Sequence, residues 1–130
     1  MTIVKQVEKL CQLIYDELGG SASELNIHKA LEIELREHHI KYMSKMIIPF
    51  KYKEWSLSYG ECDFYLPEHK LIIELKTLCY GIRHKEISQI SNYMRHIGID
   101  GVNGLICNFV PPSSKLRPAK MESYYLETYI

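Results

Sequence analysis

Hydrophobic residues recur at helical spacing over residues 3–18. One apolar face is formed by Ile3, Val7, Leu10, Ile14 and Leu18, with Val4, Cys11 and Tyr15 beside it. Apolar positions three and four residues apart lie on the same side of an α-helix. Gly19-Gly20 follows and is typical of a helix end. The pattern therefore predicts an amphipathic helix over residues 3–18.

A second amphipathic helix is predicted from Ser21 to about His39. Ser21 and Glu24 stand three residues apart, as in a capping box whose Glu side chain closes the first turn. The apolar stripe of this helix is formed by Ile27, Leu31 and Leu35, with Ala30 beside it.

From residue 46 the pattern becomes that of strands. Strands are predicted over residues 46–53, with an interruption at Pro49, over 57–66 and over 71–77. Turns at residues 54–56 and 67–70 would join them into an antiparallel meander.

The second half of the chain predicts a helix, a buried strand and a tail. The helix spans residues 83–96, with an apolar face of Ile87, Ile90 and Met94. Residues 104–110 are mostly apolar, and because they follow a helix they are expected to pair in parallel with residues 71–76. The tail over 124–130 fits either a last strand or an irregular cover. The order α-α-β-β-β-α-β predicts one α/β (α+β) domain over residues 1–130, with a mixed sheet flanked by helices.

The hairpin of residues 60–77 has a register that its hydrophobic pattern supports. A symmetric turn centred between Glu68 and His69 pairs Phe64 with Ile73. One face then carries Cys62, Phe64, Leu66, Leu71, Ile73 and Leu75. This face is expected in the core, beneath the helix of residues 83–96 or the first helix.

The other face of this hairpin carries candidate chemistry. Asp63 stands opposite Glu74, and Lys76 lies two residues further on the same face. Two facing carboxylates repel each other, and a divalent cation would offset the repulsion. The alternative is a solvated face on which Glu61 and Lys76 form an ordinary cross-strand ion pair.

Composition and charge exclude several functions. Sixteen basic and sixteen acidic residues give zero formal charge, so nucleic acid would have to be bound by a local basic patch. No apolar run is long enough to span a membrane, and the first residues lack the apolar core of a signal peptide. The four scattered cysteines are typical of reduced thiols, which predicts an intracellular, cytoplasmic location (host cytoplasm or nucleus for a viral protein).

The chain resembles the PD-(D/E)XK nuclease superfamily and, more closely, its small GxxExxY-type proteins. The matching segments are LGGSASELNIHKALEIELRE, DFYLPEHKLIIELK, QISNYMRHIG and GLICNF, within roughly residues 7–110. The chain departs from the GxxExxY pattern at Ser21, where Gly is expected, and at Ile27, where Tyr is expected. The resemblance implies a restriction-endonuclease-like core of the order α-β-β-β-α-β.

The resemblance also implies roles for the polar residues. Asp63 and Glu74 would hold Mg²⁺ or Mn²⁺ together with the backbone carbonyl of Leu75, and Lys76 would orient or activate the attacking water. Glu24 would complete the acidic cluster directly or through water, a role that competes with capping-box Glu. Gln89 lies off the apolar stripe of its helix and would reach toward this site; the alternative is a polar surface residue.

Basic residues around the third helix and in the last loop are candidates for phosphate contacts. They are Arg83, His84, Lys85, Lys115, Arg117 and Lys120. Solvated loop charges are the alternative for all six. The ten tyrosines could stack on unpaired bases, with amphipathic packing as the alternative.

Three functions remain open from the sequence. The first is a metal-dependent nuclease that hydrolyses phosphodiester bonds in DNA, with RNA as the other substrate, and a homodimer would let two sites cut two strands. The second is a catalytically silent nuclease-fold protein that binds nucleic acid or a protein partner. The third is a small structural protein that dimerises through apolar edges. A Mg²⁺ or Mn²⁺ titration separates the first from the others.

Overall fold

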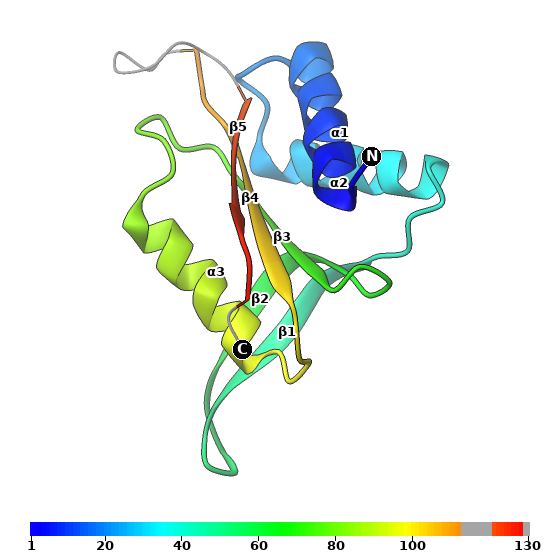
Figure 1. Ribbon diagram of the computed structural model, residues 1–130. Coiled ribbons are helices and arrows are strands. Elements are labelled where there is room, and N and C mark those ends of the chain that lie inside the picture. Colours follow the sequence, from blue (N-terminus) through cyan, green and yellow to red (C-terminus); the bar gives the residue numbers. More distant parts are fainter. Residues whose placement is uncertain (113–120, 129–130) are drawn as a thin grey trace.

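The computed structural model describes residues 1–112 and 121–128, which form a mixed sheet with helices on both faces (Figure 1). The elements are α1 (Ile3–Leu18), α2 (Glu24–Glu37), β1 (Met43–Tyr52), β2 (Trp55–Leu66), β3 (Leu71–Lys76), α3 (His84–His96), β4 (Asn103–Phe109) and β5 (Met121–Leu126). The predicted order α-α-β-β-β-α-β is confirmed and is followed by a fifth strand. No helix of the described residues is long and apolar enough to cross a membrane.

The five strands lie in the order β1-β2-β3-β4-β5, so strands adjacent in sequence are adjacent in the sheet. All neighbours are antiparallel except β3 and β4, which α3 connects in parallel. The predicted crossover is therefore confirmed. The tail of the chain supplies β5 along β4, so of the two predicted alternatives the strand is the correct one.

Each face of the sheet has its own hydrophobic core. Helices α1 and α2 cover one face, where Leu10 and Leu31 pack with Phe64, Ile73 and other sheet residues. Helix α3 covers the opposite face (Figure 1), where its buried residues pack with residues of β1 to β4. Strands β3 and β4 are buried along almost their whole length, and burial on both faces explains their apolar residues at successive positions.

The helices begin and end near the predicted residues, with one correction. Helix α1 spans Ile3–Leu18 as its periodicity predicts, and Gly19 adopts a positive φ of 81° at its end. Helix α2 is capped by Ser23, whose hydroxyl accepts a hydrogen bond from the Asn26 N–H. The predicted capping box from Ser21 is wrong, because Glu24 is the first helical residue rather than the third. Its carboxylate is therefore available for contacts outside α2.

The register of β2 and β3 agrees with the prediction at three pairs and then changes. Phe64, Tyr65 and Leu66 pair with Ile73, Ile72 and Leu71, respectively. The described pairing ends at Phe64, so the expected pairs of Glu61 with Lys76, Cys62 with Leu75 and Asp63 with Glu74 do not continue the ladder.

Cys62 lies on the opposite face from Phe64, which corrects the predicted core. Cys62 packs in the core under α3, whereas Phe64 packs under α1 and α2. The neighbouring strand shows the reason: Lys45 has a φ of 52°, and the pairing of β1 with β2 skips Lys45 and Asp63. A left-handed residue interrupts the pleat, so side chains on its two sides face different ways. The other five predicted residues do share the core under α1 and α2.

Candidate active site

Asp63 and Glu74 lie where β2 and β3 separate. The backbone N–H of Leu75 donates to Asp63 Oδ2 at 2.7 Å, and the backbone N–H of Asp63 donates to Glu74 Oε1 at 3.1 Å. Each carboxyl group thus accepts a hydrogen bond from the backbone of the opposite strand. These two side-chain hydrogen bonds take the place of the next backbone hydrogen bonds between β2 and β3. They hold the two side chains close to each other.

The carboxyl group of Glu74 is in an unfavourable environment for a negative charge. Glu74 is 5% exposed. Burial, followed by the charge of Asp63, raises the pKa of Glu74 to about 8. A bound cation would relieve the unfavourable interaction between the buried Glu74 carboxyl group and the neighbouring Asp63 carboxylate.

Glu24 approaches this pair from the first turn of α2. Burial and the charge of Asp63 raise the pKa of the Glu24 carboxyl, while Lys76 and the backbone N–H of Thr77 act in the opposite direction. These influences show that the end of β3 and the start of α2 meet at the site. Among the described residues, however, no three His, Cys, Asp or Glu side chains form a group able to hold a metal. The role of Glu24, direct or through water, stays a prediction.

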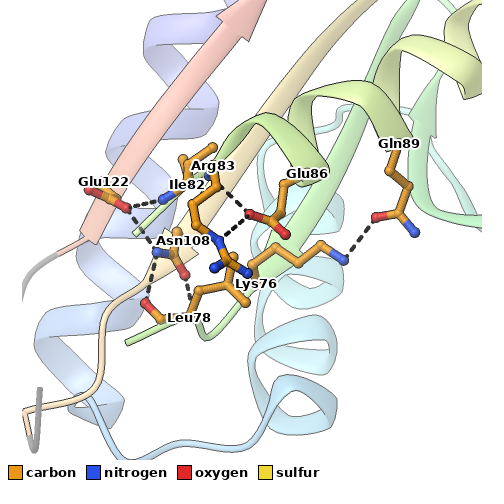
Figure 2. A network of polar contacts seen from close by, with 8 residues as sticks. All are labelled: Lys76, Leu78, Ile82, Arg83, Glu86, Gln89, Asn108 and Glu122. Atoms are coloured by element: carbon orange, nitrogen blue, oxygen red, sulfur yellow. Dashed lines mark hydrogen bonds and ion pairs between the residues drawn. The ribbon is translucent and has the colours of Figure 1, made fainter. Parts of the chain in front are cut away.

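Lys76 points from the end of β3 toward α3. Its Nζ donates to Gln89 Oε1 at 3.1 Å, as Figure 2 shows. The sequence placed Gln89 off the apolar stripe of its helix, and the structure brings it to the lysine rather than leaving it on an unrelated surface. The amide oxygen orients the ammonium group without neutralising it, because it carries no charge.

His28 belongs to the site, although sequence reasoning assigned it no role. The His28 ring is 5% exposed and stacks on Phe64 with ring centroids 4.2 Å apart. Its Nε2 lies 2.7 Å from Ser44 Oγ, and its Nδ1 lies 3.8 Å from Asp63 Oδ1. Burial lowers the pKa of His28, although the nearby charges of Asp63 and Glu32 act in the opposite direction. The available signal was its position four residues after Glu24, on the same face of α2.

A small pocket opens beside these residues on the α2 side of the sheet. Its volume is about 230 Å³, and it is lined by Glu24, Leu25, His28, Lys45, Glu61 and Asp63. The sequence did not predict that Lys45, whose φ is 52°, and Glu61 would line one pocket. The pocket gives a solvent route to Asp63, whose side chain is 29% exposed.

A buried amide holds the loop that follows the site. Asn108 of β4 is fully buried; it accepts from the Leu78 N–H at 2.7 Å and donates to Leu78 O at 3.1 Å. It also donates to Glu122 Oε1 at 2.9 Å, which accepts in addition from the Ile82 N–H (Figure 2). The network ties the segment between β3 and α3 to β4 and β5. Asn108 belongs to the segment GLICNF, but its contact with Leu78 could not be predicted from the sequence. It follows from the parallel pairing of β3 with β4, in which Lys76 is the partner of Asn108.

The predicted phosphate-binding residues fall in two regions. Arg83 caps α3, stacks its guanidinium 3.5 Å from the centroid of the Tyr80 ring and lies 3.9 Å from the Glu86 carboxylate. His84 and Lys85 are exposed in the first turn of α3. Lys115, Arg117 and Lys120 lie outside the described residues. The role of all six residues stays a prediction.

The donor set fits a hard divalent cation. Asp63 and Glu74 supply carboxylate oxygens. Leu75, which lies between Glu74 and Lys76 in the sequence, donates its N–H to Asp63. Mg²⁺ and Mn²⁺ prefer oxygen ligands, and Mg²⁺ is commonly held by one or two carboxylates with water completing the shell. The raised pKa of Glu74 also fits, because a bound cation would stabilise the ionised form of this buried carboxyl group.

The fold and this cluster define a class of protein. A mixed sheet flanked by helices, with an acidic residue on β2 and a Glu-x-Lys segment on β3, has the architecture of a restriction-endonuclease-like α+β domain. The chain belongs to the PD-(D/E)XK nuclease superfamily, whose family profile matches residues 1–119. The narrower resemblance to GxxExxY-type proteins stays a prediction.

Comparison with solved structures supports the fold. The chain is similar to the protein described as SSO0001, with a TM-score of 0.53 and 14% sequence identity. The similarity covers 98% of this chain and 66% of that one, so the chain spans about two thirds of the length of the solved protein. No curated protein matches the chain.

Proposed function

We propose that this protein is a Mg²⁺- or Mn²⁺-dependent nuclease that hydrolyses phosphodiester bonds in DNA. Membership of the nuclease superfamily supports a nuclease-type function. The observation that carries the proposal is the meeting of the half-buried Asp63 carboxylate, the buried Glu74 carboxyl group and Lys76 at the point where β2 and β3 separate.

The cation has a defined place in this proposal. Asp63, Glu74 and the backbone carbonyl of Leu75 would hold it, and it would supply charge compensation for the phosphodiester and acidify water. Glu24 lies at the margin of the site and would bind water of the metal shell.

The remaining chemistry falls to the protein's own side chains. Lys76 would donate an N–H hydrogen bond to the reacting water or to the developing charge on phosphate, and Gln89 holds the ammonium group through its amide oxygen. The Leu75 N–H holds the Asp63 carboxylate by a hydrogen bond, and the His28 ring lies beside that carboxylate. Holding these groups before substrate arrives lowers the reorganisation needed during reaction.

RNA is the other substrate that this chemistry allows, because the site geometry addresses the phosphate rather than the sugar. The buried cysteines Cys11, Cys62 and Cys107 are thiols without disulfides, which supports the proposal that the protein works in a reducing, intracellular compartment.

A cleavage assay tests the proposal. Plasmid DNA, single-stranded DNA and RNA are incubated with the protein in Mn²⁺, in Mg²⁺ and in EDTA, and cleavage is expected only with metal. Lys76→Ala should lower the cleavage rate by about 10²–10⁴-fold. Lys70→Ala is the matched control, because Lys70 lies at the other end of β3 and donates to Asp100 O. DNA binding without cleavage in any metal would favour the catalytically silent alternative.

A further inference from the structure

A pocket of about 320 Å³ opens between α3 and β1, on the face of the sheet that α3 covers. It is called the α3 pocket here, and its lining is four polar residues of α3 and two aromatic rings: Lys85, Ser88, Gln89, Asn92, Phe50 and Tyr93. The four polar residues are three or four positions apart and exposed, so they lie along one side of the helix. The α3 pocket thus combines apolar rings with a polar wall.

The two aromatic rings of the α3 pocket are fixed by their own packing. The Phe50 ring stacks on the Tyr93 ring with centroids 5.9 Å apart, and the His96 ring meets Phe50 edge-on. A Cβ at Gly60 would come within 2.5 Å of Tyr93 and 2.7 Å of Phe50, so both rings can lie against β2 only because this residue has no side chain. A planar ligand would therefore meet rings that are already ordered, which lowers the cost of binding.

The α3 pocket adjoins the candidate active site through two of its residues. Gln89 lines the pocket, and its Oε1 accepts from Lys76 Nζ at 3.1 Å (Figure 2). Tyr93 gives a second link: burial, followed by the charge of Glu74, raises the pKa of its hydroxyl, so this ring stands near the buried carboxyl group. A ligand in the pocket would therefore lie next to Lys76, on the α3 side of the site.

The charge of the α3 pocket fits a phosphate group. Among the described residues that line it, Lys85 is the only charged one. Because Gln89 contacts Lys76 through its oxygen, its amide N–H groups remain as donors. Glu86 is the only acidic residue of α3, and it is 5% exposed and lies 3.9 Å from Arg83 Nε. The exposed side of α3 therefore offers a positive charge and hydrogen-bond donors without a carboxylate.

The pocket on the α2 side of the sheet has a different charge. Three carboxyl groups line it, those of Glu24, Glu61 and Asp63, together with Lys45 and His28. Like charges repel, so a polyanionic strand is expected to run on the side where no carboxylate lines the pocket. The α2 side suits a cation and its water, and the α3 side suits the substrate.

We propose that the α3 pocket binds one nucleotide of the substrate strand beside the cleaved bond, with its base against Phe50 and Tyr93 and a phosphate against Lys85 and Gln89. This inference rests on the proposed nuclease function, because it names the subsite that holds the substrate of that site. Aromatic rings that contact a base, combined with a positive charge that contacts the backbone, are how proteins commonly hold an unpaired strand. Ser88 and Asn92 supply the polar groups that face the edge of the base.

Binding in EDTA tests the inference without cleavage. A labelled single-stranded oligonucleotide is titrated with the full chain by fluorescence anisotropy, because a base seated in a pocket must be out of the duplex stack. Lys85→Ala and Asn92→Leu should each raise the Kd at least about fivefold. Arg95→Ala is the matched control: it removes an exposed positive charge from the same helix, about 15 Å further along it, and should change the Kd by less than about twofold. All three variants should keep the wild-type melting temperature to within a few degrees, because the residues are exposed.

Two further probes separate the base from the phosphate and the strand from a free nucleotide. An abasic oligonucleotide of the same length should bind at least about fivefold more weakly than the ordinary one. Phe50→Leu removes the ring and should shrink this difference. 2′-Deoxyadenosine 5′-monophosphate should displace the oligonucleotide only at concentrations far above the Kd of the strand. Displacement at the Kd of the strand would assign the pocket to a free nucleotide and overturn the inference.

Four other outcomes would also overturn it: no measurable binding by the wild type, equal losses with Lys85→Ala and Arg95→Ala, wild-type affinity of Asn92→Leu, or equal affinity for ordinary and abasic strands. Cleavage separates this failure from failure of the proposed function. Wild-type cleavage in Mn²⁺ with no effect of the pocket variants on binding refutes the nucleotide subsite alone. Binding that depends on Lys85 and Asn92, with no cleavage in any metal, supports the subsite and refutes the nuclease.

Discussion

The Asp63 carboxylate accepts a hydrogen bond from the backbone N–H of Leu75 at 2.7 Å, across the gap between β2 and β3. In a continuous antiparallel ladder a backbone carbonyl would occupy that position. The carboxylate takes its place because the pairing of β2 with β3 ends at Phe64. The side chain of Asp63 is thus positioned by the backbone of the strand that carries Glu74 and Lys76.

Substitution of the carboxyl pair should change how the protein responds to metal. A cation that binds only the folded state stabilises it by about 2.7 kcal/mol at a hundredfold excess over its Kd, so Mn²⁺ should raise the melting temperature of the wild type. Asp63→Asn should abolish this rise, while its remaining carbonyl oxygen can still accept from the Leu75 N–H. Differential scanning fluorimetry with and without Mn²⁺ makes the measurement. An equal Mn²⁺ response in both proteins would refute metal binding at Asp63.

The metal-free protein should lose stability as the pH rises. Below the ordinary pKa of 4.5, Glu74 is protonated in both the folded and the unfolded state, so it does not make the free energy of unfolding depend on pH there. Between pH 4.5 and about 8 the unfolded chain releases this proton and the folded chain keeps it, so rising pH favours unfolding until the folded-state pKa is passed. Glu74→Gln should therefore flatten the decline in the free energy of unfolding measured in EDTA across this range. A wild type and variant with parallel pH profiles would contradict the burial of an ionisable Glu74.

Removal of the His28 ring should weaken metal binding as well as stability. The ring stacks on Phe64, contacts Ser44 and stands beside Asp63. Mutation of a residue that contacts and orients a metal ligand commonly lowers metal affinity or activity by roughly 10–100-fold. His28→Ala should raise the Mn²⁺ concentration needed for half of the thermal shift by about this factor. Ile33→Ala, an exposed residue of the same helix, is the control. A variant that is only less stable, with unchanged Mn²⁺ dependence, would make His28 a packing residue.

Substitution of Asn108 should destabilise the segment between β3 and α3. Asn108→Ala leaves the Leu78 N–H and C=O without their buried partner, at about 1–3 kcal/mol for each unsatisfied group. Asn108→Asp should be no better, because it places a carboxylate oxygen against Leu78 O and Glu122 Oε1. Urea unfolding measures both losses. A near-neutral Asn108→Asp would show that the network in Figure 2 does not depend on the amide N–H groups.

Truncation of Phe64 or Ile73 should be strongly destabilising. Both side chains are fully buried under α1 and α2, so replacement by Ala should lower the free energy of unfolding by on the order of 2–5 kcal/mol. Leu57→Ala provides the control, because Leu57 is 70% exposed and should change stability by less than about 0.5 kcal/mol. Equal effects of the buried and exposed substitutions in denaturant unfolding would contradict the assignment of the core.

The sequence by itself determined the features that depend on neighbours within a few positions. Helical periodicity predicted α1 to the residue, and alternation predicted the pairing of Phe64 with Ile73. The same alternation predicted that Asp63, Glu74 and Lys76 lie on one face of the hairpin. These features are readable because side-chain direction in a helix or strand follows from spacing alone.

Only the tertiary structure decided the features that depend on distant segments. Cys62 faces α3 rather than α1 and α2, next to the left-handed residue Lys45 of the neighbouring strand. Helix α2 begins at Glu24 with Ser23 as its cap, two residues later than the capping-box pattern predicts. His28 meets Asp63, and Asn108 meets Leu78, across 35 and 30 positions of sequence. The first contact arises when α2 packs on the sheet and the second when β4 pairs with β3, and no local spacing encodes which buried polar group will find which partner.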